Sequence, residues 1–200
     1  MTTTIYLIRH GEANNPEGII YGRLPKFGLS ALGKKEAEEV AEFLKDKDIS
    51  AIYSSPLERT KQTAEIIQKQ LGLKEIHFSE QITEGKTSYE GKKFKSLDKL
   101  QSEVYLKPLD PSDETLDEIA QRMMIFLHGV INMNDGKQVV IVSHGDPIMA
   151  LKAKIKHPSR PLEFLSFKTD NYIQHAEVYA ITAEDNQLTL KPAFKPQIED

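Results

Sequence analysis

The chain has 200 residues, 39% of them apolar, and a formal net charge of −4. A chain of this length buries roughly 70% of its unfolded surface, so we expect one domain over residues 1–200. The charge argues against general binding to nucleic acid or to an anionic membrane. Because the sequence has no cysteine, disulfides, thiolate metal sites and cysteine nucleophiles are excluded.

The sequence predicts neither a membrane span nor a secretory signal. The longest strongly apolar runs, Val139–Val142 and Met123–Leu127, are far too short to cross a bilayer. The first residues lack the basic segment, followed by an apolar one, that is typical of a secretory signal. We therefore expect a cytoplasmic protein, and a homodimer is left open as an alternative to a monomer.

Three short apolar runs predict buried strands, and each is followed directly by a possible helix start. The runs are Thr4–Ile8, Ala51–Tyr53 and Gln138–Val142. Apolar residues at helical spacing predict one amphipathic helix after Ser30 and another after Ser112. Alternating strands and helices predict an α/β fold, a three-layer α/β/α sandwich with a mostly parallel sheet.

The C-terminal part of the chain has a different pattern. Apolar runs within Glu163–Leu190, the first of them Phe164–Phe167, predict two or three further strands, with an antiparallel edge as one possibility. The last nine residues, Pro192–Asp200, contain two prolines and little pattern, so we expect them to fray.

The first and third predicted strands end in the same way, in a histidine followed by a glycine. The two endings are Arg9-His10-Gly11 and Ser143-His144-Gly145. In an open α/β sheet the ligand crevice lies beyond the carboxyl ends of the strands, so both imidazoles are expected there. Glycine after each histidine lets the backbone turn sharply and approach a ligand.

Two helix starts at the same edge predict a site for an anion. Asp146 and Pro147 have the pattern of an N-cap followed by the first helical residue. Ser55 and Glu58 have the spacing of a capping box, which places Arg59 in the first turn of a helix. Free amides at a helix start and a guanidinium both donate to phosphoryl oxygens.

Each of these residues also has an ordinary structural interpretation. A single histidine at a strand end is usually a surface or hydrogen-bonded residue, and an arginine in a first helical turn is usually solvated. The coincidence of such residues at three strand ends favours one anion-binding pocket. The histidines without such a setting, which we expect to be structural or exposed, are His77, His128, His157 and His175.

The sequence resembles the histidine phosphatase superfamily, the phosphoglycerate-mutase-like fold with an Arg-His-Gly signature. The resemblance extends over most of the chain, at residues 5–12, 21–24, 28–37, 52–64, 114–122 and 139–146. It implies that His10 is the nucleophile that accepts the phosphoryl group. It also implies that His144, Arg9 and Arg59 hold that group while it is transferred.

The resemblance assigns the general acid and a wider set of substrate-binding residues. The acid is expected in Ile82-Thr83-Glu84, followed by Tyr89-Glu90-Gly91, so Glu84 is the nearest match, with Glu80 and Glu90 as alternatives. The expected substrate-binding residues are Arg9, Asn15, Gly22, Arg23, Arg59 and Gly145. A lysine-rich segment near 84–113 is either a solvated helix face or a lid that draws in anionic substrates.

The resemblance therefore implies metal-independent hydrolysis of small phosphorylated metabolites through a phosphohistidine, with no cofactor and no metal. Two alternatives are phosphoglycerate mutase-type phosphoryl transfer and a non-catalytic module that binds phosphorylated ligands. A metallohydrolase that uses His10, Glu12, His144 and Asp146 is a further alternative, with suitable ligand types. Arg9 and Arg59 argue against it because they add positive charge beside a cation.

Overall fold

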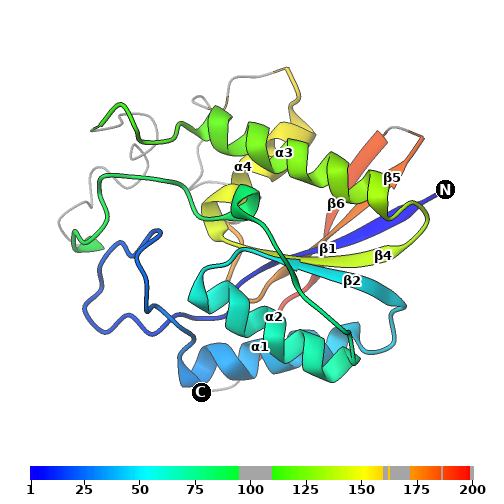
Figure 1. The fold of residues 1–200 in the computed structure, drawn as a ribbon, viewed down its shortest axis with the longest axis horizontal. Helices are drawn as coiled ribbons and strands as arrows, with labels where there is room; N and C mark the ends of the chain where they lie inside the picture. Colours follow the sequence, from blue (N-terminus) through cyan, green and yellow to red (C-terminus); the bar gives the residue numbers. More distant parts are fainter. Residues whose placement is uncertain (95–109, 160–161, 163–171, 186, 199–200) are drawn as a thin grey trace.

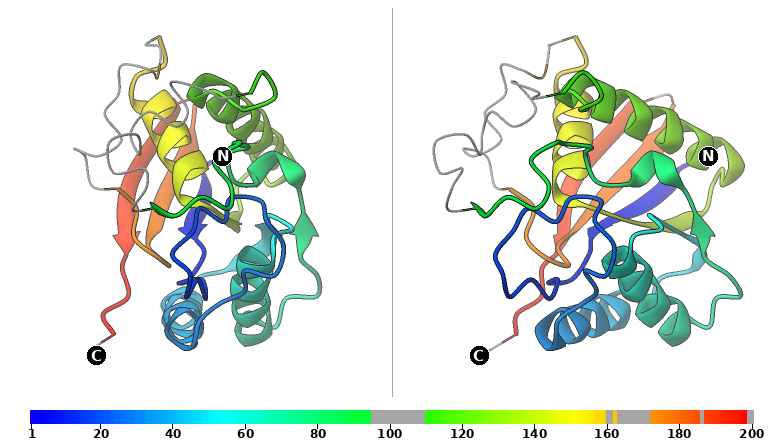
Figure 2. Two further views of the ribbon diagram at one scale, coloured as in Figure 1. Left: turned by 90° about the vertical axis from the view of Figure 1, so that its left-hand side faces the viewer. Right: turned by 60° about the vertical axis from the view of Figure 1, so that its left-hand side comes forward.

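The computed structural model describes residues 1–94, 110–159, 162, 172–185 and 187–198. A six-stranded sheet forms its central layer, and helices cover both faces (Figure 1). Helices α1 and α2 pack together on one face, and α3 and α4 pack together on the other (Figure 2). The expected three-layer α/β/α architecture is confirmed.

The sheet is mixed, so the prediction of a mostly parallel sheet holds only for one part of it. Its strands are β1 (Thr3–Arg9), β2 (Ile49–Ser54), β3 (His77–Phe78), β4 (Gln138–Ser143), β5 (Val178–Glu184) and β6 (Gln187–Phe194). The order is β3-β2-β4-β1-β5-β6. The first four strands in this order pair in parallel, whereas β5 is antiparallel to β1 and to β6. Antiparallel neighbours need only a short connection, whereas neighbouring parallel strands need a crossover.

Side-chain caps that fit the sequence begin two of the long helices, α1 and α3. The helical elements are α1 (Ala31–Leu44), α2 (Glu58–Leu71), the short 3-10 helix η1 (Glu80–Ile82), α3 (Leu116–Met133) and α4 (Gly145–Lys156). Ser30 caps α1 by accepting a hydrogen bond from Gly33 N. Thr115 caps α3, and Glu118 completes a capping box there. The two helices that the sequence predicts after Ser30 and after Ser112 are both present.

The apolar run of β1 supplies both hydrophobic cores, which explains why it does not alternate with polar residues. Ile5 and Leu7 point into the core under α3 and α4. Tyr6 and Ile8, the residues next to them, point into the core under α1 and α2. Consecutive residues of a strand face opposite sides of a sheet, so a strand that is covered on both sides needs apolar residues throughout.

The structure tests the fraying predicted for the C-terminus but not the strand predicted at Phe164–Phe167. The prediction that residues from Pro192 onward fray is wrong for the first three, because β6 continues to Phe194 and pairs with β5. As an edge strand, β6 accommodates Pro192, which lacks a ladder donor. The predicted strand Phe164–Phe167 lies outside the described residues.

The lysine-rich segment near 84–113 is described only at its two ends, since residues 95–109 lie outside the described part of the chain. Hydrogen bonds join the two described ends of the segment to each other. The amide of Glu114 donates to the carbonyl of Lys86 at 3.0 Å, and Asp113 accepts from the amide of Ser88 at 2.7 Å. No helix among the described residues is long and apolar enough to cross a membrane.

Candidate active site

The two histidines that follow β1 and β4 meet at the carboxyl edge of the sheet. These strands are parallel neighbours, with Arg9 opposite Ser143, so the residues that follow them emerge side by side. The ring centroids of His10 and His144 are 5.2 Å apart, and both side chains are buried. The two rings therefore lie close enough to contact one phosphoryl group between them.

Arg59 reaches the same point from the first turn of α2. Its side chain is fully buried, and its Nε donates to Nε2 of His10 at 3.1 Å. Its Nη2 donates to the carbonyl of Gly22 at 2.8 Å, and its guanidinium lies 4.6 Å from the centroid of the Tyr21 ring. The structure thus places a permanent positive charge directly beside the His10 imidazole.

The capping box that the sequence predicts at the start of α2 does not form. The cap residue is Leu57, which has no side-chain hydrogen bond to the helix. The hydroxyl of Ser55 instead lies 2.8 Å from Nε2 of His144. It also accepts a long, 3.4 Å bond from the Leu57 amide, and its own proton can be donated to Nε2 of His144. In that arrangement the other ring nitrogen of His144, Nδ1, carries a proton.

The hydrogen bonds of His10 define which of its nitrogens has a free electron pair. Its Nδ1 lies 2.7 Å from the carbonyl oxygen of Gly11, which accepts a proton but has none to donate. The proton is therefore on Nδ1, and Nε2 holds the lone pair. Burial, and then the charges of Arg59 and Arg9, lower the pKa of His10 well below its ordinary value. His10 is consequently neutral near pH 7, as a nucleophile must be.

Glycine follows each histidine because a larger residue has no space there. A Cβ on Gly11 would run into the backbone of Gly33 in α1, and one on Gly145 would run into the Tyr172 hydroxyl. Helix α4 begins at Gly145 with His144 as its cap residue, so the expectation that Asp146 is the cap is wrong. Asp146 accepts a 2.7 Å hydrogen bond from the Tyr172 hydroxyl instead.

Glu84 is the carboxyl that the structure brings to the histidines. Its Oε2 lies 3.9 Å from Nδ1 of His144 and 4.0 Å from Nη2 of Arg59. Its side chain is only 14% exposed, and the Gly85 amide donates to its Oε1 at 3.0 Å. Burial, and then the charge of Asp146, raise the pKa of Glu84 to about 7. Near neutral pH this carboxyl is therefore about equally divided between its acid and base forms.

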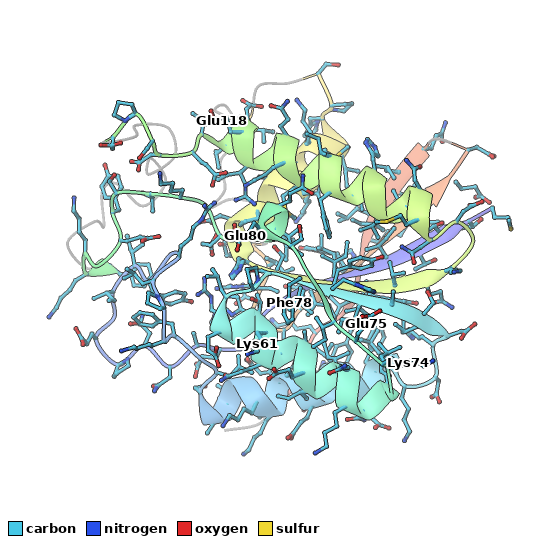
Figure 3. All side chains as sticks on the ribbon, in the orientation of Figure 1. Lys61, Lys74, Glu75, Phe78, Glu80 and Glu118 are labelled. Atoms are coloured by element: carbon cyan, nitrogen blue, oxygen red, sulfur yellow. The ribbon has the colours of Figure 1, made fainter. Side chains whose placement is uncertain are left out.

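The two alternative acids lie in other surroundings. Glu80 is exposed on η1 (Figure 3). Glu90 accepts a 2.6 Å hydrogen bond from the backbone amide of Arg23, and a Cβ on Gly22 would run into its carboxyl group. Glu90 therefore holds the loop at residues 22 and 23, while Glu84 faces the histidine pair.

Arg23 and Asn15, two expected substrate-binding residues, are used by the surrounding loops. Arg23 donates from Nε to the backbone carbonyl of Glu84 at 2.7 Å and from Nη2 to the carboxylate of Glu114 at 2.6 Å. The side chain of Asn15 bonds both backbone polar groups of Ile19. Within the described residues neither side chain hydrogen-bonds to His10 or His144. Arg23 thus supports the backbone that carries Glu84.

Two polar atoms around the histidines are buried and unpaired. They are Nε of Arg9 and Nδ1 of His144, and neither has a hydrogen-bond partner in the described part of the chain. Most buried donors in folded proteins are paired. Two unpaired donors from adjacent strand ends indicate a place that a ligand with acceptor oxygens would complete.

His175 belongs to this site, although the sequence predicts a structural or surface role for it. Its ring centroid is 5.8 Å from that of His10, and its Nε2 lies 3.0 Å from Nη2 of Arg9. It precedes β5, whose first residue Val178 pairs with Ile8 at the carboxyl end of β1. The sequence holds a signal for this position only if β5 is recognised as antiparallel, because an antiparallel neighbour begins where β1 ends.

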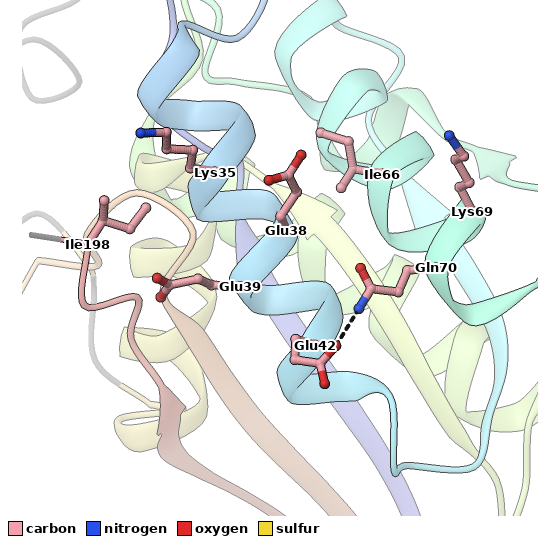
Figure 4. Close-up of a pocket in the computed structure, with 8 residues that line it drawn as sticks. All are labelled: Lys35, Glu38, Glu39, Glu42, Ile66, Lys69, Gln70 and Ile198. Carbon is pink, nitrogen blue, oxygen red and sulfur yellow. Dashed lines mark hydrogen bonds between the residues drawn. The ribbon is translucent and has the colours of Figure 1, made fainter.

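Two other features of the described residues offer no competing site. Within the described ranges no group of three histidine or acidic residues is placed to hold a metal ion. A hollow of about 780 Å³ lies over α1 and α2 (Figure 4). Its lining residues are Lys35, Glu38, Glu39, Glu42, Ile66, Lys69, Gln70 and Ile198. None of the predicted site residues lines it.

Comparisons with known proteins agree with this geometry. The family model of the histidine phosphatase superfamily (branch 1) matches residues 5–193. PhoE of Bacillus subtilis, named as an uncharacterized phosphatase, is 34% identical over 154 residues, which cover 76% of this chain and 77% of PhoE. The structure of Bacillus stearothermophilus YhfR matches with a TM-score of 0.84 at 25% identity, over 98% of both chains.

A further structure was solved with a ligand. It is a phosphoserine phosphatase from Entamoeba histolytica in complex with 3-phosphoglyceric acid, with a TM-score of 0.79 and 26% identity over 98% of both chains. This chain belongs to the histidine phosphatase superfamily. Other relatives are named phosphoserine phosphatases and phosphoglycerate mutases. The expectations of a phosphoglycerate-mutase-like fold and of a phosphatase-type enzyme are thereby confirmed.

Proposed function

We propose that this protein hydrolyses small phosphomonoesters through a phosphohistidine at His10, without a metal. The observation that carries the proposal is the pair of buried donors, Arg9 Nε and His144 Nδ1, that have no partner within the described residues. An unpaired buried donor costs about 1–3 kcal/mol, which a bound acceptor would recover. Phosphoryl oxygens are charged acceptors, and they suit a pocket that also holds the guanidinium of Arg59.

The nucleophile in this proposal is Nε2 of His10. Its lone pair accepts the hydrogen bond from Arg59 Nε at 3.1 Å in the absence of substrate. An incoming phosphoryl group offers Arg59 a stronger, charged acceptor, and this exchange frees the lone pair for attack on phosphorus. The Nδ1 bond to the Gly11 carbonyl keeps the ring oriented and stabilises the positive charge that the ring gains.

Each step has a donor and an acceptor among these residues. As the bond from Nε2 to phosphorus forms, the bond from phosphorus to the ester oxygen breaks, and Glu84 gives that oxygen its proton. Water then attacks phosphorus, Glu84 takes a proton from the water, and the bond to Nε2 breaks to release phosphate. A carboxyl with a pKa of about 7 suits both roles, since each form is well populated near neutral pH.

Charge on the transferring group is held by fixed protein donors in this scheme. Arg9, Arg59 and His144 surround the nucleophile from three strand ends, and α4 directs its positive end at the same place. Such preorganised donors stabilise the equatorial oxygens of a phosphoryl transition state. Two arginines also disfavour a cation at this position, which is why the proposal is metal-independent.

The substrate is proposed only as a class, small phosphorylated metabolites. Related structures were solved with phosphoserine and with 3-phosphoglyceric acid, which are both small phosphomonoesters. Mutase-type transfer is a second candidate because some relatives are named probable phosphoglycerate mutases. In that case the phosphoryl group on His10 would pass to a second hydroxyl of an organic acceptor instead of to water.

A screen of phosphorylated metabolites with and without EDTA tests the proposal. We expect release of inorganic phosphate from at least one small monoester, with the same rate in EDTA. Transfer of the phosphoryl group to an organic acceptor without release of phosphate would favour the mutase. Activity that EDTA abolishes and a divalent ion restores would contradict the proposal, and binding without turnover would indicate a non-catalytic module.

A further inference from the structure

Three residues of one short segment, 172–175, contact the side chain of Arg9. Its guanidinium lies 5.4 Å from the centroid of the Tyr172 ring. Its Nη1 donates to the carbonyl of Ile173 at 2.8 Å, and its Nη2 bonds Nε2 of His175 at 3.0 Å. Each terminal nitrogen therefore bonds this segment through one of its two N–H groups, while Nε is a buried donor without a partner in the described residues. The segment thus orients the guanidinium of Arg9 beside the histidine pair.

Both acceptors in this segment are uncharged. The carbonyl of Ile173 has no net charge, and burial together with the charge of Arg9 lowers the pKa of His175 to about 4. His175 is therefore neutral near pH 7, and its Nε2 accepts from Arg9. An uncharged acceptor orients an arginine but does not cancel the positive charge that attracts a phosphoryl group.

The arginines that support the backbone of Glu84 are held in the opposite way. Arg23 and Arg122 both bond the carboxylate of Glu114, at 2.6 and 2.7 Å. That carboxylate offsets their charge, which suits residues with a structural role. The guanidinium of Arg9, in contrast, contacts neutral groups of the 172–175 segment.

We propose that His175 is a positioning residue of the active site, which as an uncharged acceptor fixes Arg9 and leaves its full positive charge available to the phosphoryl group. The inference rests on the proposed function only in taking the bound group to be a phosphoryl group. His175 itself does not exchange a proton or a bond with the substrate in this role.

Glutamine and glutamate separate this role from simple packing, because they have the same size and differ in charge. In His175→Gln the side-chain oxygen accepts from Arg9 and the charge of Arg9 is preserved. In His175→Glu the hydrogen bond is also retained, but the carboxylate neutralises Arg9. His175→Leu removes the acceptor. His128→Glu, which adds the same charge on the exposed face of α3, is the matched control.

The experiment measures the binding of orthovanadate and of inorganic phosphate to the full chain by titration calorimetry, together with kcat and KM for one active substrate. We expect His175→Gln to bind within about threefold of the wild type, as His128→Glu does. We expect His175→Glu and His175→Leu to bind vanadate about 10- to 100-fold more weakly, less than the 10²–10³-fold cost of removing a whole oxyanion donor. The value of kcat/KM should fall in the same order.

Equal affinities in the glutamine and glutamate variants, whether both normal or both weak, would overturn the proposal, because charge would then be irrelevant. Normal binding by the leucine variant would overturn it as well. Failure of the proposed function gives a different result. A wild-type chain that binds phosphate but never becomes phosphorylated would refute the proposed catalysis, while the comparison of variants would still test the positioning of Arg9.

Discussion

At the scale of single residues, the surroundings of Glu84 raise the pKa of an ordinary carboxyl group. It is surrounded by two arginines and a histidine, yet its pKa is raised to about 7, because burial and the nearby Asp146 together outweigh the charge of Arg59. Burial disfavours the charged form of any acid. A group that is half protonated near pH 7 is suited to give a proton in one step and take one in the next.

Replacement of Glu84 should slow phosphoenzyme formation most for substrates with poor leaving groups. We expect Glu84→Gln to slow phosphoenzyme formation from sugar or glycerate phosphates about 10²–10⁴-fold, the range of general acid catalysis. The loss with p-nitrophenyl phosphate should be much smaller, because nitrophenolate leaves without a proton. Rapid-quench measurement of the first step gives both values, and Glu80→Gln on exposed η1 is the control. Equal losses with both substrates would contradict an acid role.

The dependence of kcat/KM on pH should report the ionisation of Glu84. Since the first step needs the protonated form of Glu84, kcat/KM should fall above about pH 7, approaching tenfold per pH unit. The histidines have lowered pKa values and remain neutral over this range, so they do not cause the fall. Profiles of the wild type and of Glu84→Gln check this prediction. An alkaline limb that persists unchanged in Glu84→Gln would assign the ionisation to another group.

At the scale of elements, the start of α1 supports the loop that carries His10. The hydroxyl of Ser30 donates to the Glu12 carboxylate at 2.6 Å, and the Glu12 carbonyl accepts from the Ser30 amide at 2.9 Å. A Cβ on Gly33 would run into the backbone of Glu12. Helix α1 therefore packs against this loop at backbone distance, which only glycine at position 33 allows.

Two helical glycines should respond to alanine with opposite signs. We expect Gly33→Ala to lower the free energy of unfolding by about 1–3 kcal/mol, as overpacking does. Gly129→Ala in α3, where nothing lies within 4 Å of an added Cβ, should raise that free energy by about 0.5–1 kcal/mol through helix propensity. Urea unfolding measures both changes. A neutral or stabilising Gly33→Ala would contradict the close contact between α1 and the His10 loop.

The elements also show what could be predicted from the sequence and what could not. The three apolar runs that become β1, β2 and β4 predict three strand ends at one edge of the sheet and the meeting of two histidines there, because parallel strands present their carboxyl ends together. The capping role that the sequence predicts for Ser55 is wrong because its hydroxyl bonds His144, a partner 89 residues away. His175 was missed because the direction of β5 is a long-range property that local pattern does not carry.

At the scale of the whole molecule, the site requires the protein to bury neutral histidines, which makes its stability depend on pH. Burial lowers the pKa of His10, His144 and His175 in the folded state. In the unfolded chain these groups bind protons below about pH 6.5, so acidification favours unfolding. Glu84 acts in the opposite direction, because its raised pKa gives stability that is lost as the pH rises through about 7.

The free energy of unfolding should therefore decrease as the pH falls from 6.5 towards 4. Each neutral histidine contributes a slope of up to about 1.4 kcal/mol per pH unit. His175→Gln should have a shallower decrease, by as much as one histidine's share, since the pKa of His175 is about 4 in the folded state. Urea titrations at several pH values measure these slopes, with the exposed His128→Gln as control. Parallel slopes for wild type and His175→Gln would contradict a half-buried, neutral His175.

The central claim concerns the whole reaction, and the residue that carries the phosphoryl group tests it most directly. The full chain in EDTA is mixed with p-nitrophenyl phosphate, quenched in alkali and analysed by peptide mass spectrometry. We predict an acid-labile, base-stable phosphoryl group on His10, lost in His10→Ala and retained in His77→Ala on exposed β3. A phosphoryl group on any other residue, or turnover that requires a divalent ion and leaves His10 unmodified, would contradict the account.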